Sequence, residues 1–144
     1  MENSRFKFRV WSNKHNRYIV DSHYPIGSDH IIVIQQDGKV YNLGLGDYED
    51  DSNVHSWGVI EEFADCVVEQ CTGWRDKRLK PIYENDIVKA CFSEITFIGT
   101  VVFNNDKGFG VIYQETKNSR LFMPFLSLND IEIVGNIHEQ KDNK

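Results

Sequence analysis

The sequence lacks the features that identify several classes of protein. It has no apolar run near the length of about 18 residues that a membrane-spanning helix needs. Its first residues, Met1 to Trp11, alternate charged and aromatic side chains, so we expect no signal peptide. Proline occurs only 3 times in 144 residues, and 40% of the residues are apolar, which excludes collagen and intrinsic disorder. We therefore expect a globular protein of the cytoplasm with no membrane contact.

The sequence also lacks a recognisable catalytic or metal-binding motif. Cys66, Cys71 and Cys91 are odd in number and do not have zinc-knuckle spacing, so we expect reduced structural thiols. The 5 histidines are scattered, and none lies at motif spacing from a nucleophile. No phosphate-binding glycine motif is present. We therefore predict no enzyme activity, no metal and no cofactor.

Basic charge is scarce in the first half of the chain. Residues 1–72 carry 6 Lys/Arg against 12 Asp/Glu, whereas residues 73–144 carry 10 of each. The resulting net charge of −6 repels phosphate backbones and disfavours nucleic acid as a general partner. The acidic residues at 47–51 lack the spacing of a calcium loop and are interpreted as a flexible loop. The charge difference indicates two units that meet near residue 70.

What the sequence does contain is short apolar segments of strand character. In the first half, alternation and β-branched residues predict strands at 6–11, 18–20, 31–34 and 40–43. Asp37-Gly38 predicts a tight hairpin turn, and residues 44–53 are the best candidate for a linker or mobile loop. We expect a short helix at 59–64 and a strand at about 65–70.

The second half shows five strand-like segments at roughly ten-residue spacing. They lie at 86–92, 96–103, 109–114, 120–123 and 131–137, with Gly99 marking a bulge or bend. This spacing predicts a five-strand, SH3-like, curled antiparallel barrel. The predicted fold class is therefore α+β and β-rich. Its domains are an acidic hairpin unit with a short helix at 1–72 and a barrel unit at 73–144. An alternative is that the opening strand pairs with the barrel unit at 73–144.

Three segments in order carry a family resemblance. Residues 7–11 read Lys-Phe-Arg-Val-Trp, residues 70–88 contain Thr-Gly-Trp-Arg-Asp-Lys and Ile-Tyr-Glu-Asn-Asp-Ile-Val, and residues 133–139 read Ile-Val-Gly-Asn-Ile-His-Glu. Together they resemble the YopX protein family of phage and prophage genomes. Trp74, Asn85 and His138 stand where the family usually has Leu, Gly and Tyr. The resemblance implies a small phage or prophage protein of mixed, β-rich fold, and it brings no catalytic residues or substrate.

The connector at 69–88 holds the sharpest candidate residues for a site. A basic group beside two aromatic rings would contact nucleic acid or a protein partner, but the favoured interpretation is a solvated loop tip. This group comprises Trp74, Arg75, Lys77, Arg78, Lys80 and Tyr83. The three carboxylates of Asp76, Glu84 and Asp86 would suit a divalent metal. We favour a structural role, in which such side chains accept backbone N–H bonds that hold the turns. These structural turn residues are Thr72, Gly73, Asp76, Glu84, Asn85 and Asp86.

Two functional hypotheses follow from these residues. The favoured one is a non-enzymatic interaction protein of a phage or prophage programme, acting in the host-cell cytoplasm. It would self-associate as a homo-oligomer and bind a phage or host protein. The alternative is a weak nucleic-acid-associated protein that uses the basic loop at 75–80.

Overall fold

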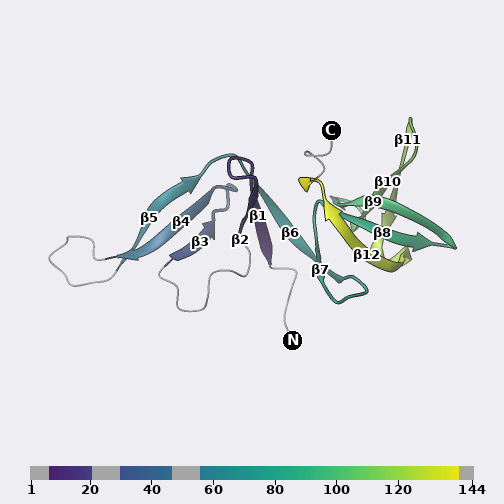
Figure 1. The fold of residues 1–144 in the computed structure, drawn as a ribbon, viewed down its shortest axis with the longest axis horizontal. Helices are drawn as coiled ribbons and strands as arrows, with labels where there is room; N and C mark the ends of the chain where they lie inside the picture. The colour runs from purple at the N-terminus through teal and green to yellow at the C-terminus, as the bar shows by residue number, and fades with distance from the viewer. Residues whose placement is uncertain (1–6, 21–29, 47–55, 140–144) are drawn as a thin grey trace. The chain divides into compact units, whose positions relative to one another are not determined.

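The computed structural model describes residues 7–20, 30–46 and 56–139, and these are almost entirely β-structure (Figure 1). Residues 47–53 of the predicted linker or mobile loop, which include the acidic residues at 47–51, lie outside the described residues. In chain order the elements are β1(Phe8–Ser12), β2(Arg17–Val20), β3(His30–Ile34), β4(Val40–Gly46), β5(Ser56–Phe63), β6(Cys66–Arg75), β7(Pro81–Tyr83), β8(Asp86–Phe92), β9(Ile95–Asn104), β10(Gly108–Thr116), β11(Ser119–Pro124), the 3₁₀ turn η2(Phe125–Ser127) and β12(Asn129–Asn136).

The α part of the predicted fold class is not confirmed, and the short helix expected at 59–64 is wrong. Residues 59–63 instead belong to β5, which pairs with β4 along its length. Ser56 lies opposite Gly46 at one end, and Phe63 lies opposite Val40 at the other. The local pattern suits a helical turn or a strand equally, and pairing with a neighbouring strand decides between them. No helix in the described residues is long and apolar enough to cross a membrane.

The chain divides into two compact units. The first unit comprises Met1–Phe8 and Glu69–Lys144, and the second comprises Arg9–Val68. The boundary expected at residue 72 lies inside β6, a few residues beyond this division. The Cys71 N–H donates to the Lys7 carbonyl oxygen at 2.9 Å, so the segment before β1 pairs within the first unit.

The second unit is built from hairpins around a small apolar core. Strands β3, β4 and β5 form an antiparallel sheet in that order, and β1 pairs with β2. Gly38 has a φ of 86°, as the Asp37-Gly38 turn requires, and the Lys39 N–H donates to the Asp37 carboxylate at 3.0 Å. Val10, Ile19 and Val40 form the buried centre of this unit.

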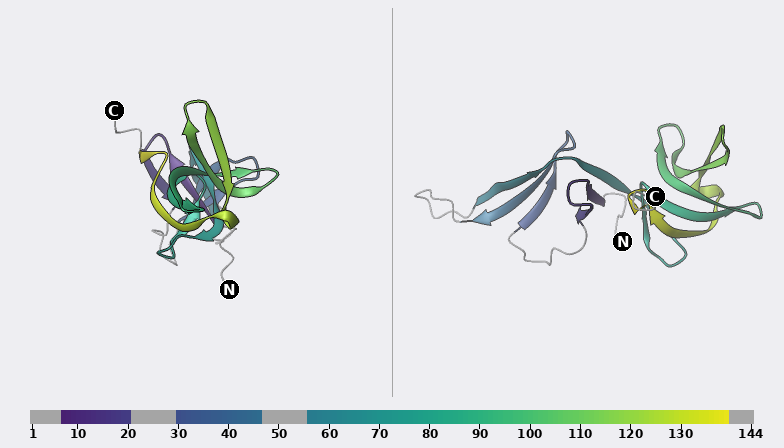
Figure 2. Two further views of the ribbon diagram at one scale, coloured as in Figure 1. Left: turned by 90° about the vertical axis from the view of Figure 1, so that its right-hand side faces the viewer. Right: turned by 45° about the horizontal axis from the view of Figure 1, so that its top comes forward.

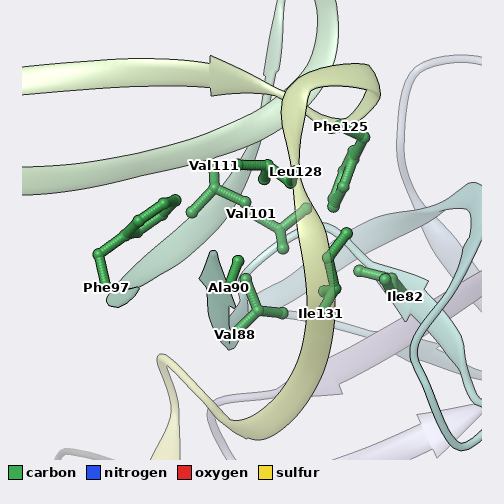
Figure 3. Close-up of a cluster of buried hydrophobic side chains, with 9 residues drawn as sticks. All are labelled: Ile82, Val88, Ala90, Phe97, Val101, Val111, Phe125, Leu128 and Ile131. Carbon is green, nitrogen blue, oxygen red and sulfur yellow. The ribbon is translucent and has the colours of Figure 1, made fainter. Parts of the chain in front are cut away.

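The first unit contains a curled antiparallel sheet in the order β11-β10-β9-β8-β12 (Figure 2). All five strands predicted between residues 86 and 137 form, and the sheet closes into a half-barrel. Its concave face holds the main core (Figure 3), which comprises Ile82, Val88, Ala90, Phe97, Val101, Val111, Phe125, Leu128 and Ile131. A Cβ at Gly99 would lie 2.5 Å from the Ile112 carbonyl oxygen, so only glycine permits this close approach of β9 to β10.

Candidate functional site

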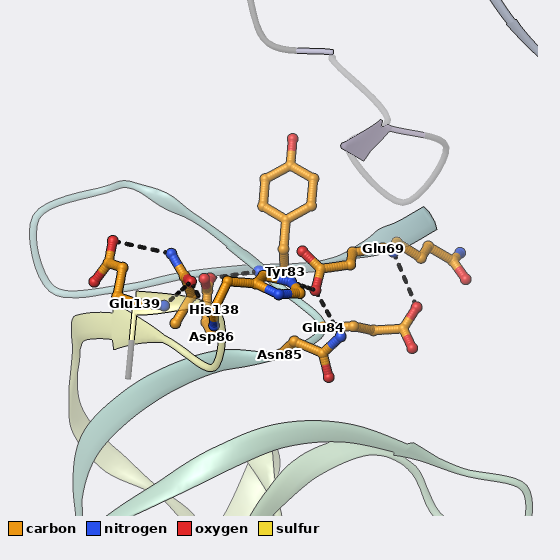
Figure 4. Close-up of polar contacts among 9 residues, drawn as sticks. Glu69, Tyr83, Glu84, Asn85, Asp86, His138 and Glu139 are labelled. Carbon is orange, nitrogen blue, oxygen red and sulfur yellow. Dashed lines mark hydrogen bonds and ion pairs between the residues drawn. The ribbon is translucent and has the colours of Figure 1, made fainter. Parts of the chain in front are cut away.

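Two sequence segments far apart in the chain meet in the first unit around one buried carboxylate (Figure 4). Glu69 of β6 is fully buried, and its Oε2 accepts a hydrogen bond from Asn85 Nδ2 at 2.6 Å. The same oxygen lies 3.1 Å from Nε2 of His138, which is also buried. A buried carboxylate is tolerated only with such partners, because burial removes its hydration. We call Glu69, Asn85 and His138 the Glu69 network.

The turn between β7 and β8 presents Asn85 to this network. The Glu84 N–H donates to the Gln70 carbonyl oxygen at 3.0 Å, and Glu84 Oε1 accepts from the Gln70 N–H at 2.9 Å. Asp86 Oδ2 accepts from the Tyr83 N–H at 2.8 Å. Asn85 has a φ of 68°, a left-handed conformation that asparagine tolerates better than most residues. The tight turn and the β6–β7 pairing therefore fix the Asn85 side chain beside Glu69.

The residues after β12 position His138. Asn136 Oδ1 accepts from the N–H groups of His138 and Glu139 at 2.9 and 3.2 Å, which closes a turn. Ile137 N–H donates to the Asn85 carbonyl oxygen at 3.0 Å. The turn after β12 is thus joined to the β7–β8 turn in two ways. The backbone bond from Ile137 to Asn85 links them directly, and the side chains of His138 and Asn85 both contact Glu69.

Asp76 organises a second, separate turn in the connector. Its Oδ1 accepts from the N–H groups of Arg78 and Lys80, both at 2.9 Å, and its Oδ2 accepts from that of Ile133 at 3.2 Å. Burial raises the pKa of Asp76, but the N–H donors of Lys80, Ile133 and Arg78 and the charge of Lys80 outweigh it. The pKa of Asp76 therefore lies below its usual value.

The basic residues of the connector are exposed, and three of them have local partners. Lys77 Nζ and Arg78 Nη2 contact the Glu132 carboxylate at 3.0 and 2.8 Å. The hydrogen bond and charge of Lys77, with the charges of Arg78 and Lys89, hold the pKa of Glu132 below its usual value. Arg75 Nη1 donates to the Leu79 carbonyl oxygen at 2.9 Å. Lys80 is also exposed on this loop.

The two aromatic rings expected beside the basic loop lie in different environments. Trp74 is 39% exposed and stacks on Phe125 of the core, with ring centroids 5.6 Å apart. Tyr83 is half-buried, and its ring points away from the Glu69 network (Figure 4). Thr72 Oγ1 accepts from the Trp74 N–H at 3.0 Å, and Gly73 has a φ of 85°. Thr72 and Gly73 therefore lie at a bend within β6.

The three candidate metal-binding carboxylates do not form one cluster. Asp76 binds the backbone of its own turn and of β12, whereas Glu84 and Asp86 bind the backbone around the β7–β8 turn. Within the described ranges, no group of three or more His, Cys, Asp or Glu side chains is arranged to hold a metal ion. The arrangement holds backbone segments together through charged acceptors.

Sequence reasoning missed the residues at the centre of the site. Glu69, His138 and Glu132 each join segments that are distant in the chain, so no local motif reveals them. One signal was present for Glu69. It shares the inward face of β6 with Cys71, because both positions are buried and two residues apart. A charged residue at an inward position indicates a buried polar partner.

The comparisons with known proteins bear on this fold directly. The family model described as YopX protein matches residues 7–142. The chain belongs to the YopX protein family. It is similar to the crystal structure of protein yopX from Bacillus subtilis, with 16% sequence identity and a TM-score of 0.53. That similarity covers 96% of this chain and 97% of the other, and it shows the fold. No curated protein matches the sequence.

Proposed function

We propose that this YopX family protein is a non-enzymatic interaction module that self-associates through the tip of the β8–β9 hairpin. Phe92 and Ile95 flank the turn at this tip and are 41% and 62% exposed. Ser93 and Glu94 both have positive φ, which makes the connection a tight two-residue turn. Neighbouring exposed apolar side chains mark protein interaction surfaces more often than isolated ones do. This apolar tip is the observation that supports the proposal.

A binding role also agrees with the way the first unit uses its polar residues. Glu69, Asp76 and Asp86 accept hydrogen bonds from the protein's own groups, and these bonds hold turns and strands together. The curled sheet, for which we retain an SH3-like barrel as a proposal, would serve as a rigid support for the hairpin. We infer a phage or prophage role in the host-cell cytoplasm, with a second copy or a phage or host protein as partner.

The test changes the hairpin tip and measures mass in solution. Light scattering over a range of concentrations should show an oligomer of the native chain. The double variant Phe92→Ser with Ile95→Lys should remain a monomer, because it removes the apolar contact and adds a charge. Asn105→Lys is the matched control, since it adds the same charge at the exposed β9–β10 turn. A strictly monomeric native chain, or unchanged association of the double variant, would refute the proposal.

The alternative is weak nucleic-acid binding by the loop at 75–80. Its support is that Arg75, Lys77, Arg78 and Lys80 are all exposed beside the partly exposed Trp74. Against it, Glu132 contacts Lys77 and Arg78, and the net charge of −6 repels phosphate.

A labelled oligonucleotide titration at low salt separates the two functions. If the alternative is right, changing both Arg75 and Arg78 to Ala abolishes binding. Glu132→Gln should then strengthen binding, because it releases the two cations from their carboxylate partner. Lys117→Ala, an exposed cation on another turn, should have no effect. The absence of any binding would eliminate the alternative.

A further inference from the structure

We propose that a groove on the outer face of the half-barrel binds a small amphipathic carboxylate, an aliphatic chain with a carboxylate head. The groove has a volume of about 450 Å³. It is lined by Ile87, Ile98, Gly99, Thr100, Val102, Ile112, Tyr113, Gln114 and Arg120. All of these residues belong to the first unit, and they include no residue of the hairpin tip or of the Glu69 network.

The groove lies where two hairpins diverge. Strand β10 pairs with β9 over a short stretch only. The pairing begins where Gly108 lies opposite Asn104 and ends where Ile112 lies opposite Thr100. Beyond this point β9 continues alongside β8, and β10 continues alongside β11. The two hairpins consequently leave the sheet in different directions (Figure 1). Their separation opens a space that a single flat sheet would not have.

Part of the groove wall is aliphatic. Side chains alternate along β9, so Phe97 and Val101 face the core while Ile98 and Val102 lie on the opposite face. Ile98 is 61% exposed, although it is a large aliphatic residue in the middle of a paired strand. Ile112 of β10 adds a further aliphatic surface. Covering these side chains with an alkyl chain would remove apolar surface from water.

Among the described residues that line the groove, Arg120 carries the only formal charge. Arg120 of β11 pairs in register with Gln114, and both line the groove. The lining contains no Asp or Glu, and within the described residues Arg120 makes no ion pair. A guanidinium group binds a carboxylate through two parallel hydrogen bonds. Charge complementarity therefore favours an anionic head group and disfavours a cationic one.

The size of the groove favours a small ligand. Its volume lies within the range of about 300–1,000 Å³ that is typical of small-molecule sites. Such sites combine apolar walls with a few polar groups that orient the ligand. Thr100, Gln114 and Arg120 would supply those groups here.

The test titrates the full ¹⁵N-labelled chain with decanoate below its micelle concentration. Decan-1-ol and decyltrimethylammonium serve as matched probes with neutral and cationic heads. Decanoate should shift the amide signals of Ile98, Thr100, Ile112 and Arg120 saturably. It should bind about tenfold tighter than the alcohol, because only the carboxylate makes charge-assisted hydrogen bonds. The ammonium probe should bind no better than the alcohol.

Two substitutions of exposed residues test the role of Arg120 in binding. Arg120→Gln should weaken decanoate binding about tenfold, whereas Lys117→Gln removes an equal charge outside the groove and should leave binding unchanged. The proposal is overturned if decanoate shifts no groove amides, if Arg120→Gln binds equally well, or if all three probes bind alike. The Phe92→Ser and Ile95→Lys double variant should still bind decanoate, so failure of self-association and failure of this site are distinguishable.

Discussion

Single buried acceptors hold the connector of the first unit in place. Asp76 accepts three backbone N–H bonds and lies 4% exposed, so its charge is an integral part of the turn. Glu69 has a comparable role between β6, the β7–β8 turn and His138. Removing one partner from such a group leaves the others buried without a hydrogen bond, which costs more than the bond itself contributes.

The Asp76 carboxylate should make the stability of the first unit depend on pH. Its pKa is lower in the folded than in the unfolded chain, so ionised Asp76 stabilises the fold above the unfolded pKa of about 4. This contribution is lost as the pH falls through the folded pKa. Asp76→Asn should destabilise the protein by about 2 kcal/mol at pH 7. The amide NH₂ of the asparagine would face a backbone N–H group from which the carboxylate oxygen now accepts a hydrogen bond.

Urea denaturation of Asp76→Asn and the native chain measures this effect. The difference between the two variants should shrink as the pH is lowered below about 4, where Asp76 of the unfolded chain takes up a proton, and should be lost as the pH falls through the lower pKa of the folded chain. Asp106→Asn is a suitable control, since Asp106 is exposed on the β9–β10 turn. A difference that stays constant with pH would contradict the role assigned to the Asp76 charge.

The Glu69 network should show energetic coupling between Glu69 and His138. Glu69→Ala should destabilise the protein by about 3 kcal/mol, because the partly buried Asn85 amide and the buried His138 ring lose this acceptor. The double variant with His138→Ala should be less destabilised than the sum of the two single variants. A double-mutant cycle of unfolding free energies measures this coupling. Strict additivity would show that the two side chains do not interact.

At the scale of elements, strand positions follow from the sequence better than strand partners do. The five strands of the half-barrel are predicted because alternation and turn residues are local signals. The helix at 59–64 is mispredicted because β5 owes its conformation to pairing with β4. The Glu69 network is missed for the same reason, since His138 lies 69 residues from Glu69 in the chain. Local sequence carries no direct record of contacts made at that separation.

The curl of the sheet should depend on Gly99. An added methyl group at this position would lie 2.5 Å from the Ile112 carbonyl oxygen and 2.6 Å from Val111 Cγ1. Because both neighbours belong to a packed strand, Gly99→Ala should destabilise the protein by about 1–3 kcal/mol. Thermal or urea unfolding measures the change, with the exposed Thr96→Ala on the same strand as control. Native stability of Gly99→Ala would show that β10 can shift to accept the methyl group.

At the scale of the whole molecule, charge and exposed apolar surface support the interaction role that we propose for this protein. The excess of negative charge lies before residue 73, and the basic loop that follows has Glu132 as a local counter-charge. This distribution weakens the case for nucleic acid and leaves the apolar hairpin tip as the main candidate for contact. The assignment of 1–72 and 73–144 as separate domains stays a prediction.

The most direct test of self-association is a concentration series of amide spectra of the full ¹⁵N-labelled chain. We predict that the Phe92 and Ile95 signals shift or broaden as the concentration rises, while those of the β9–β10 turn at Asp106 and Lys107 do not. This pattern would locate the contact at the β8–β9 tip. Spectra that stay unchanged at these two residues over the whole range would contradict it.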